Sequence, residues 1–327
     1  MLFAAASAAA ATWPLGLAAA MAAERAAPSA PARPWRAAPF APLADHVAMQ
    51  IACLPRLVLV AATYWYCLRG WRVFAAELAW RWVLAGVARD VGLALAIGGV
   101  TDFLLLADAS PFRAAMAPHK FNAAYPALLT RRGTAPVARD IALSCVSAAL
   151  AGLLEALVLH AYATGRARAP NVPGDAWWTH GPTVVLMLSW FYSQNVHFYA
   201  LHRCMHAWRV PGVPDVGAWL YRHVHSVHHG ARNPTAFSGI AMHPVAFIYI
   251  KANLICAAML GHAGFEYPAA ASWPHFLHHS LVQVNYAENH VPLDWLFGTF
   301  AADEKDAEAS IARRFGAHPP PLGTKAE

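Results

Sequence analysis

Residues 202–206 read HRCMH, residues 225–229 read HSVHH and residues 275–279 read HFLHH. Within each cluster the histidines stand one, three or four residues apart, and on a helix residues at i, i+3 and i+4 project from one face. Each cluster can therefore direct two or three imidazoles to one point. Neutral imidazole is the commonest metal ligand among protein side chains. Because eight histidines exceed what one ion would take, the pattern predicts two metal ions held close together.

The repetition of the clusters separates a metal site from ordinary core histidines. A single H-x-x-x-H pair is weak evidence, but eight buried histidines would each need a separate hydrogen-bond partner or a shared ion. Imidazole suits zinc, copper, iron and nickel. Structural zinc sites usually contain cysteine and bind four ligands, which this set does not resemble. Two irons of higher coordination number would use these ligands and leave positions for dioxygen, while copper and zinc stay open from the residues alone.

Four further histidines are candidates near the clusters. His262 follows an apolar segment at the same inferred depth, and we expect it to be a ligand. His243 directly precedes a proline, His197 lies five residues before His202, and His223 lies in the segment leading into the second cluster. We expect these three to be additional ligands or to orient the ligands through hydrogen bonds.

The composition is that of a membrane protein. Hydrophobic residues make up 58% of the chain and charged residues 13%, whereas about a quarter of a typical soluble domain is charged. Mean hydropathy is +0.36. The net charge of +6 comes from scattered basic residues, which favours membrane orientation over nucleic-acid binding. The five cysteines form no C-x-x-C pair, so neither a disulfide framework nor a zinc finger is indicated.

We divide the chain into four segments. Residues 1–45 form an Ala/Pro-rich extension that lacks the basic start of a signal peptide. Residues 46–140 contain membrane and interfacial helices and a basic loop. Residues 141–300 carry the histidine clusters and form the predicted catalytic domain. Residues 301–327 are charged, then proline-rich, and are expected to be a mobile tail.

Two segments, 141–163 and 183–201, are long and apolar enough to span a bilayer. The segment 91–107 is a shorter candidate. The loop 108–140 has five Lys/Arg residues, whereas the loop 165–182 has two. By the positive-inside rule the histidine clusters should face the cytosol.

The apolar segment 244–261 would cover about 27 Å as a helix, close to the thickness of the bilayer core. Clusters on both sides of it must meet at one metal site, which excludes a single crossing. We expect the segment to dip into the bilayer and turn back, or to lie in the interface, and Lys251 fits either arrangement. Glu155 and His160, inside a predicted span, are either functional or a polar contact between packed helices.

These motifs, in this order, resemble the fatty acid hydroxylase/sterol desaturase superfamily, with the sterol C5-desaturase branch closest. The resemblance covers about residues 140–300. Besides the three clusters, it rests on residues 221–229, 242–245, 261–266, 285–286 and 293–299. The chain departs from the family at Ala246, Ala263 and Ala287, where glutamate, aspartate and glycine are usual. None of these departures removes a cluster histidine.

The resemblance implies an all-α, polytopic membrane helical bundle with a cytosolic, histidine-rich di-metal cap. It also implies that the di-iron centre itself is the catalyst, with no separate acid or base. Electrons would come from NAD(P)H through a cytochrome b5-type donor and its reductase. The implied location is the endoplasmic reticulum membrane, with a plastid or other membrane as the alternative. The implied iron ligands are His202, His206, His225, His228, His229, His262, His275, His278 and His279.

The function favoured on this basis is O2-dependent desaturation or hydroxylation of a membrane lipid, with a sterol as the first candidate substrate. The alternatives within the superfamily are a fatty acid or sphingolipid hydroxylase and a sterol C4-methyl oxidase. From other classes, an inactive metal-binding relative and a membrane metal transporter stay open. The clusters follow the predicted spans and carry arginines, which argues against a transporter, whose ligands would lie inside the spans.

Overall fold

The computed structural model describes residues 75–117, 120–121, 134–167, 195–210, 212–231, 234–250, 258–259, 261–265, 272–287 and 293–316. The predicted N-terminal extension and most of the predicted span 183–201 lie outside these residues. Within them no strand occurs, and an isolated bridge between Lys120 and Phe265 is the one element of β pairing. The predicted all-α class is confirmed.

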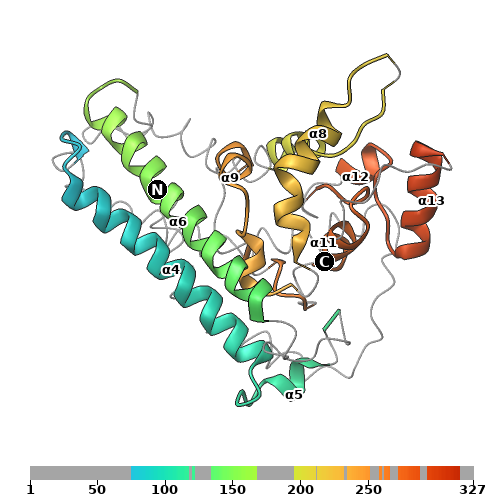
Figure 1. Cartoon of the computed structure of the whole chain (residues 1–327), viewed down its shortest axis with the longest axis horizontal. Coiled ribbons are helices and arrows are strands. Elements are labelled where there is room, and N and C mark those ends of the chain that lie inside the picture. Colours follow the sequence, from blue (N-terminus) through green and yellow to red (C-terminus); the bar gives the residue numbers. More distant parts are fainter. Residues whose placement is uncertain are drawn as a thin grey trace, which may run out of the picture.

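Two long helices lie side by side and run in opposite directions, α4 (Trp80–Leu106) and α6 (Thr134–Ala163) (Figure 1). Both are long and apolar enough to cross a membrane. The α6 span matches the predicted segment 141–163, whereas α4 begins eleven residues before the predicted 91–107, at Trp80. Their close packing depends on Gly152, since a Cβ there would lie 2.8 Å from the Cα of Val87.

Polar side chains inside the two long helices contact each other. Glu155 on α6 forms an ion pair with Arg89 on α4, which also binds Asp90 at 2.8 Å. His160 lies with Nδ1 2.8 Å from the carbonyl oxygen of Ala75. Glu155 thus makes the polar contact between packed helices that was one of the two interpretations offered above, whereas His160 contacts a backbone carbonyl that precedes α4.

A core joins the two long helices to the rest of the molecule. It contains Ile97 of α4, Ala148 of α6, Phe237 of the short 3-10 helix η4 (Ala236–Gly239) and Phe247 of α9 (Pro244–Ile250). Met259 belongs to the same core. Both described ends of the segment 244–261 therefore pack in one place, as expected of a segment that leaves and returns. Residues 251–257, including Lys251, lie outside the described part of the chain.

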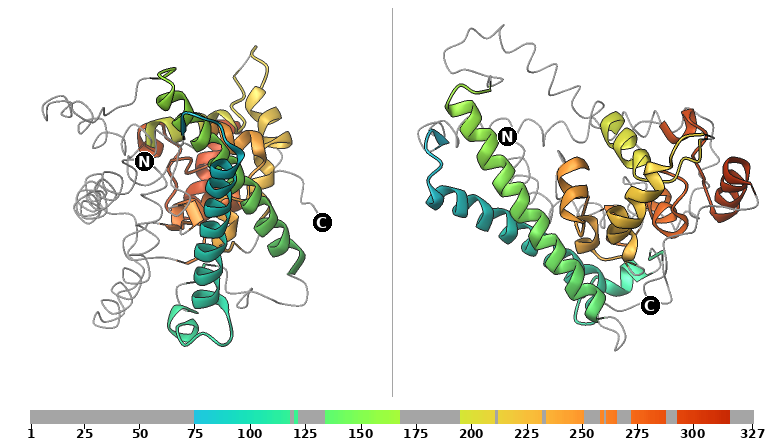
Figure 2. Two further views of the ribbon diagram at one scale, coloured as in Figure 1. Left: turned by 90° about the vertical axis from the view of Figure 1, so that its left-hand side faces the viewer. Right: turned by 45° about the horizontal axis from the view of Figure 1, so that its top comes forward.

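The remaining elements form a cap on one side of the α4–α6 pair (Figures 1 and 2). In chain order they are a helical stretch at 195–204, α8 (Val216–His223), the 3-10 helix η3 (His225–Gly230), α11 (Ser272–Leu281), α12 (Leu293–Leu296) and α13 (Glu304–Phe315). The short helix α5 (Arg113–Met116) follows α4. The cap carries all three histidine clusters.

The segment expected to be a mobile tail begins with an ordered helix. Asp303 caps α13 by accepting a hydrogen bond from the backbone N–H of Asp306 at 2.8 Å, and Gly316 ends the helix at φ 67°. Ala307 of α13 is fully buried in a core with Val284. The structure thus has a helix at Glu304–Phe315 where the sequence led us to expect a mobile tail, and the apolar face of this charged helix packs against the cap.

Candidate metal centre

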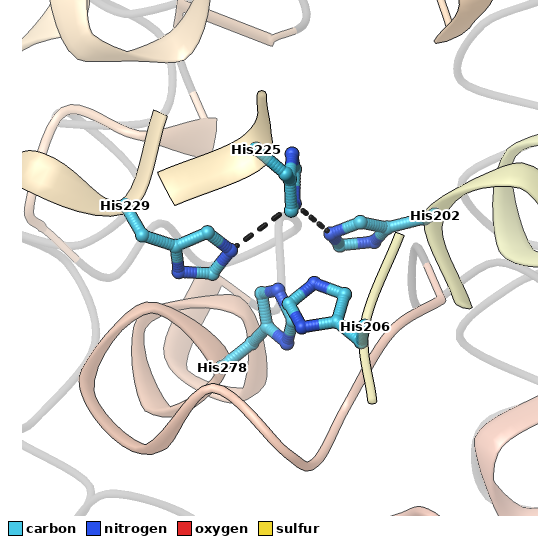
Figure 3. A group of neighbouring side chains, drawn as sticks. All are labelled: His202, His206, His225, His229 and His278. Atoms are coloured by element: carbon cyan, nitrogen blue, oxygen red, sulfur yellow. Dashed lines mark hydrogen bonds between the residues drawn. The ribbon is translucent and has the colours of Figure 1, made fainter. Parts of the chain in front are cut away.

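Nine histidines come together in two neighbouring groups, and the ligand nitrogens within each group lie within 4.8 Å of one another. In the first group the imidazole rings point toward a common centre (Figure 3). These are the nine histidines named as ligands from the sequence. The first group consists of His202, His206, His225, His229 and His278, and the second of His228, His262, His275 and His279.

The two H-x-x-H-H clusters are each divided between the groups. On α11, His275 and His279 belong to the second group, whereas His278 belongs to the first. η3 divides its three histidines in the same way, with His228 alone in the second group. Consecutive residues of a helix project about 100° apart, so adjacent histidines aim at different points. The expectation that each cluster serves one point was wrong for these two clusters.

Backbone carbonyls fix the orientation of three rings. A carbonyl oxygen only accepts, so each Nδ1 is the donor and each Nε2 presents a lone pair to its group. The Nδ1–H groups donate from His202 to Tyr286 at 2.7 Å, from His278 to Val284 at 2.6 Å and from His262 to Ala258 at 2.6 Å.

The nitrogens that face the two centres are arranged for a cation. Nε2 of His202 lies 3.0 Å from Nε2 of His225, and Nε2 of His275 lies 2.7 Å from Nε2 of His262. Both nitrogens of the fully buried His206 have no hydrogen-bond partner. Unpaired buried polar atoms cost free energy, and converging lone pairs repel unless a cation lies between them. The donor set therefore fits a metal ion in each group.

For seven of the nine imidazoles, burial lowers the pKa and so favours the neutral form that binds metal. It lowers the pKa of His202 to about 4, and a hydrogen bond to the Tyr286 carbonyl offsets part of the effect. Burial, reinforced by repulsion from neighbouring histidines, holds six further pKa values well below the ordinary 6.5. These belong to His206, His225, His228, His229, His278 and His279.

A buried carboxylate that the sequence reasoning did not single out supports the first group. Asp294 of α12 accepts hydrogen bonds from the backbone N–H groups of Tyr286 at 2.8 Å and Ala287 at 2.6 Å. The hydroxyl of Thr299 donates to it at 2.6 Å. This anchors the turn whose Tyr286 carbonyl orients His202. The available signal was an aspartate within an otherwise apolar motif at 293–299.

The three other candidate histidines lie outside both groups. His197 and His223 are exposed, and the ring of His223 lies 5.0 Å from that of Trp219. His243 accepts a hydrogen bond from the backbone N–H of Val245 at 3.2 Å, at the start of α9. These three side chains therefore do not join the nine histidines of the two groups.

Comparison with known proteins gives the family of this region. Residues 187–273 match the fatty acid hydroxylase family model. A very-long-chain aldehyde decarbonylase, GL1-11 of Oryza sativa subsp. indica, is 28% identical over 165 residues, which cover 40% of this chain and 58% of that protein. Methylsterol monooxygenase 2-2 of Arabidopsis thaliana is 27% identical over 146 residues, covering 35% of this chain and 51% of that protein. The chain thus spans about half the length of these relatives, and no solved structure matches it.

Proposed function

Because this chain belongs, through residues 187–273, to the fatty acid hydroxylase/sterol desaturase superfamily, we propose that it is an oxygen-dependent oxidoreductase that acts on a membrane lipid. The observation that carries the proposal is the pair of histidine groups, in each of which the ligand nitrogens lie within 4.8 Å of one another. We propose that the first group holds one iron ion and the second group the other. Nitrogen-only ligation of two adjacent ions favours iron over a structural zinc site.

When bound, the iron pair would supply the oxidising power to remove hydrogen from an unactivated C–H bond with dioxygen. The chain itself supplies orientation and exclusion of water. His202 and His278 are held by backbone carbonyls, and both side chains are at most 1% exposed. Whether hydroxylation or desaturation results depends on where the reacting carbon lies relative to the two groups.

For the substrate we propose a sterol, with oxidation of a C4 methyl group first among the sterol reactions. The support is a relative named methylsterol monooxygenase, and the sterol C4-methyl oxidase was among the alternatives from the sequence. The sequence analysis favoured C5-desaturase specificity, and the names of the relatives do not support it. A long-chain aldehyde or acyl lipid is the second candidate, since two rice relatives, GL1-11 and GL1-8, are named very-long-chain aldehyde decarbonylases.

We further propose the membrane setting and the electron supply. Two apolar helices, α4 and α6, support a membrane location, and the resemblance adds the endoplasmic reticulum with the cap facing the cytosol. Electrons would come from NAD(P)H through a cytochrome b5-type donor and its reductase.

Elemental analysis of detergent-purified protein from iron-supplemented cells tests the metal. We expect close to two irons per chain, and His228→Ala and His279→Ala should lose iron and activity together. His223→Ala, which changes an exposed histidine outside both groups, is the matched control. One zinc, or no metal, would overturn the di-iron proposal.

Labelled sterols, long-chain aldehydes and fatty acids, fed to a host that lacks these enzymes, test the substrate. Oxidation of a methylsterol is the expected result, and oxidation of the aldehyde alone would favour the second candidate. A protein with two irons that forms no product from any of the three lipids would be an inactive relative. Full activity of His279→Ala would refute the ligand assignment.

A further inference from the structure

The two histidine groups differ in their burial. In the first group, four side chains are at most 1% exposed: His202, His206, His225 and His278. In the second group His228 is buried to a comparable degree, at 4%, whereas His275 and His279 are partly exposed. In the first group His229 is the one partly exposed member, so the second group has the larger partly exposed share.

A small cavity lies beside this more open group. Three of its histidines line it, and the remaining wall includes Phe121 and Phe276. No histidine of the first group contributes. The cavity volume is about 10 Å³, close to the space that one water-sized molecule occupies. It is thus matched to a molecule of a few atoms and is far smaller than a lipid chain.

Phe121 is held at this cavity by backbone pairing. Its N–H donates to the carbonyl oxygen of Gly264 at 3.1 Å, and the adjacent residues Lys120 and Phe265 form the antiparallel bridge. Gly264 has φ +82°, and a Cβ there would lie 3.0 Å from the carbonyl oxygen of Pro234. A residue with a side chain is disfavoured at this position, so the contact depends on glycine. Lys120 and Phe121 precede the family-matched residues 187–273 in the chain. Their backbone contacts nevertheless hold them beside the second group.

Aromatic rings make the outer wall apolar. The ring of Phe121 lies 5.0 Å from that of Phe276 and 5.3 Å from that of Trp273. Phe276 stands between His275 and His279 on α11, so the wall and two candidate ligands share one helix. The lining is thus largely apolar, with the imidazoles of the second group as its polar part. Dioxygen matches this cavity in size and polarity.

We propose that this cavity is the port through which a small exogenous ligand reaches the second group, and that Phe121 sets its width. The identity of the ligand as dioxygen rests on the function proposed above. The choice of the second group over the first rests on the burial difference and on the cavity lining. Enlarging or shrinking residue 121 should therefore change the rate of ligand entry without changing the iron content.

Azide binding to the oxidised, iron-loaded full chain measures this rate without turnover. Stopped-flow absorbance of the azide-to-iron charge-transfer band would be compared among wild type, Phe121→Ala and Phe121→Trp. The matched control is Phe103→Ala, a phenylalanine 50% exposed on α4. We expect azide association to be severalfold faster with alanine, slower with tryptophan and unchanged in the control, with equal iron content in all four proteins.

The outcomes separate this inference from the proposed function. Unchanged azide kinetics in both Phe121 variants, with two irons and normal product formation, would overturn the port alone. Absence of iron from the wild-type protein would overturn the port and the proposed function together. If Phe121→Ala does not retain iron, Phe121→Leu replaces it, and equal rates for the leucine and tryptophan variants would refute the inference.

Discussion

Asp294→Ala should weaken the cap and its hold on the first histidine group. The carboxylate accepts two backbone N–H groups, from Tyr286 and Ala287, and the hydroxyl of Thr299. The Tyr286 carbonyl orients His202, so a loosened turn would release one candidate ligand. The substitution thus acts on stability and on metal retention at once.

The expected magnitude follows from the donors left without acceptors. Thr299 also lies 3.4 Å from the backbone carbonyl of Asp294 and can turn to it, so we count the two N–H groups alone. Each unpaired buried donor costs about 1–3 kcal/mol. Burial raises the pKa of Asp294, against the effect of its hydrogen bonds, so removing the carboxylate recovers part of that cost. We expect a net loss of about 2–4 kcal/mol.

Thermal unfolding in detergent, followed by tryptophan fluorescence at a fixed scan rate, measures the loss. At roughly 2 °C per kcal/mol, the midpoint should fall by roughly 4–8 °C, and the purified protein should hold less iron than wild type. Asp294→Asn keeps one acceptor oxygen, so its unfolding midpoint should lie between those of wild type and Asp294→Ala. Asp303→Ala, which removes the cap of α13, is the control and should leave the iron content unchanged. A midpoint for Asp294→Ala within roughly 2 °C of wild type, with full iron, would refute the reasoning.

Three further predictions concern the metal centre and its support. His206→Ala should lower the iron content to less than half of the wild-type value, whereas His223→Ala should leave it unchanged, as measured by elemental analysis. Because buried histidines with lowered pKa values bind fewer protons in the folded state than in the unfolded state, their contribution to stability is present above the ordinary pKa of 6.5. It is lost as the pH falls, for His202 toward about 4. The unfolding midpoint of metal-free protein should therefore fall on acidification from pH 7 to pH 5, and the loaded protein should release iron in the same range. A midpoint that is independent of pH over this range would contradict this assignment of protonation states. Gly239→Ala places a Cβ 2.2 Å from the carbonyl oxygen of Ala258 and should destabilise the protein by about 1–3 kcal/mol; equal unfolding midpoints would show that this contact relaxes freely.

The sequence predicted the residues of the centre better than their arrangement. Side-chain type and three- or four-residue spacing mark eight of the nine histidines that the structure brings together, and His262 was expected from its place after the apolar segment. Which histidine serves which group depends on the direction of each ring about its helix axis. His223 shows why spacing alone does not predict which histidines face the centre. It ends α8, and at Val224 the backbone leaves helical geometry (φ −127°, ψ −56°), so His225 turns inward while His223 stays exposed.

Features built from backbone partners were not predictable from the residues. The role of Asp294 is seen from the backbone N–H groups that donate to it, and every residue except proline carries such a group. The bridge between Lys120 and Phe265 joins two short segments with no alternating pattern that would indicate a strand. Helices, by contrast, follow from long apolar runs, and α6 matched its predicted span for that reason.

The division of each H-x-x-H-H cluster between both groups would couple ion binding at the two proposed sites. η3 and α11 each supply both groups, so an ion bound in one orders the helices that the other requires. The entropy of ordering them is lost once, and the second ion then binds to a preformed site. Iron uptake should accordingly be positively cooperative, with chains that carry a single ion scarce at every iron concentration.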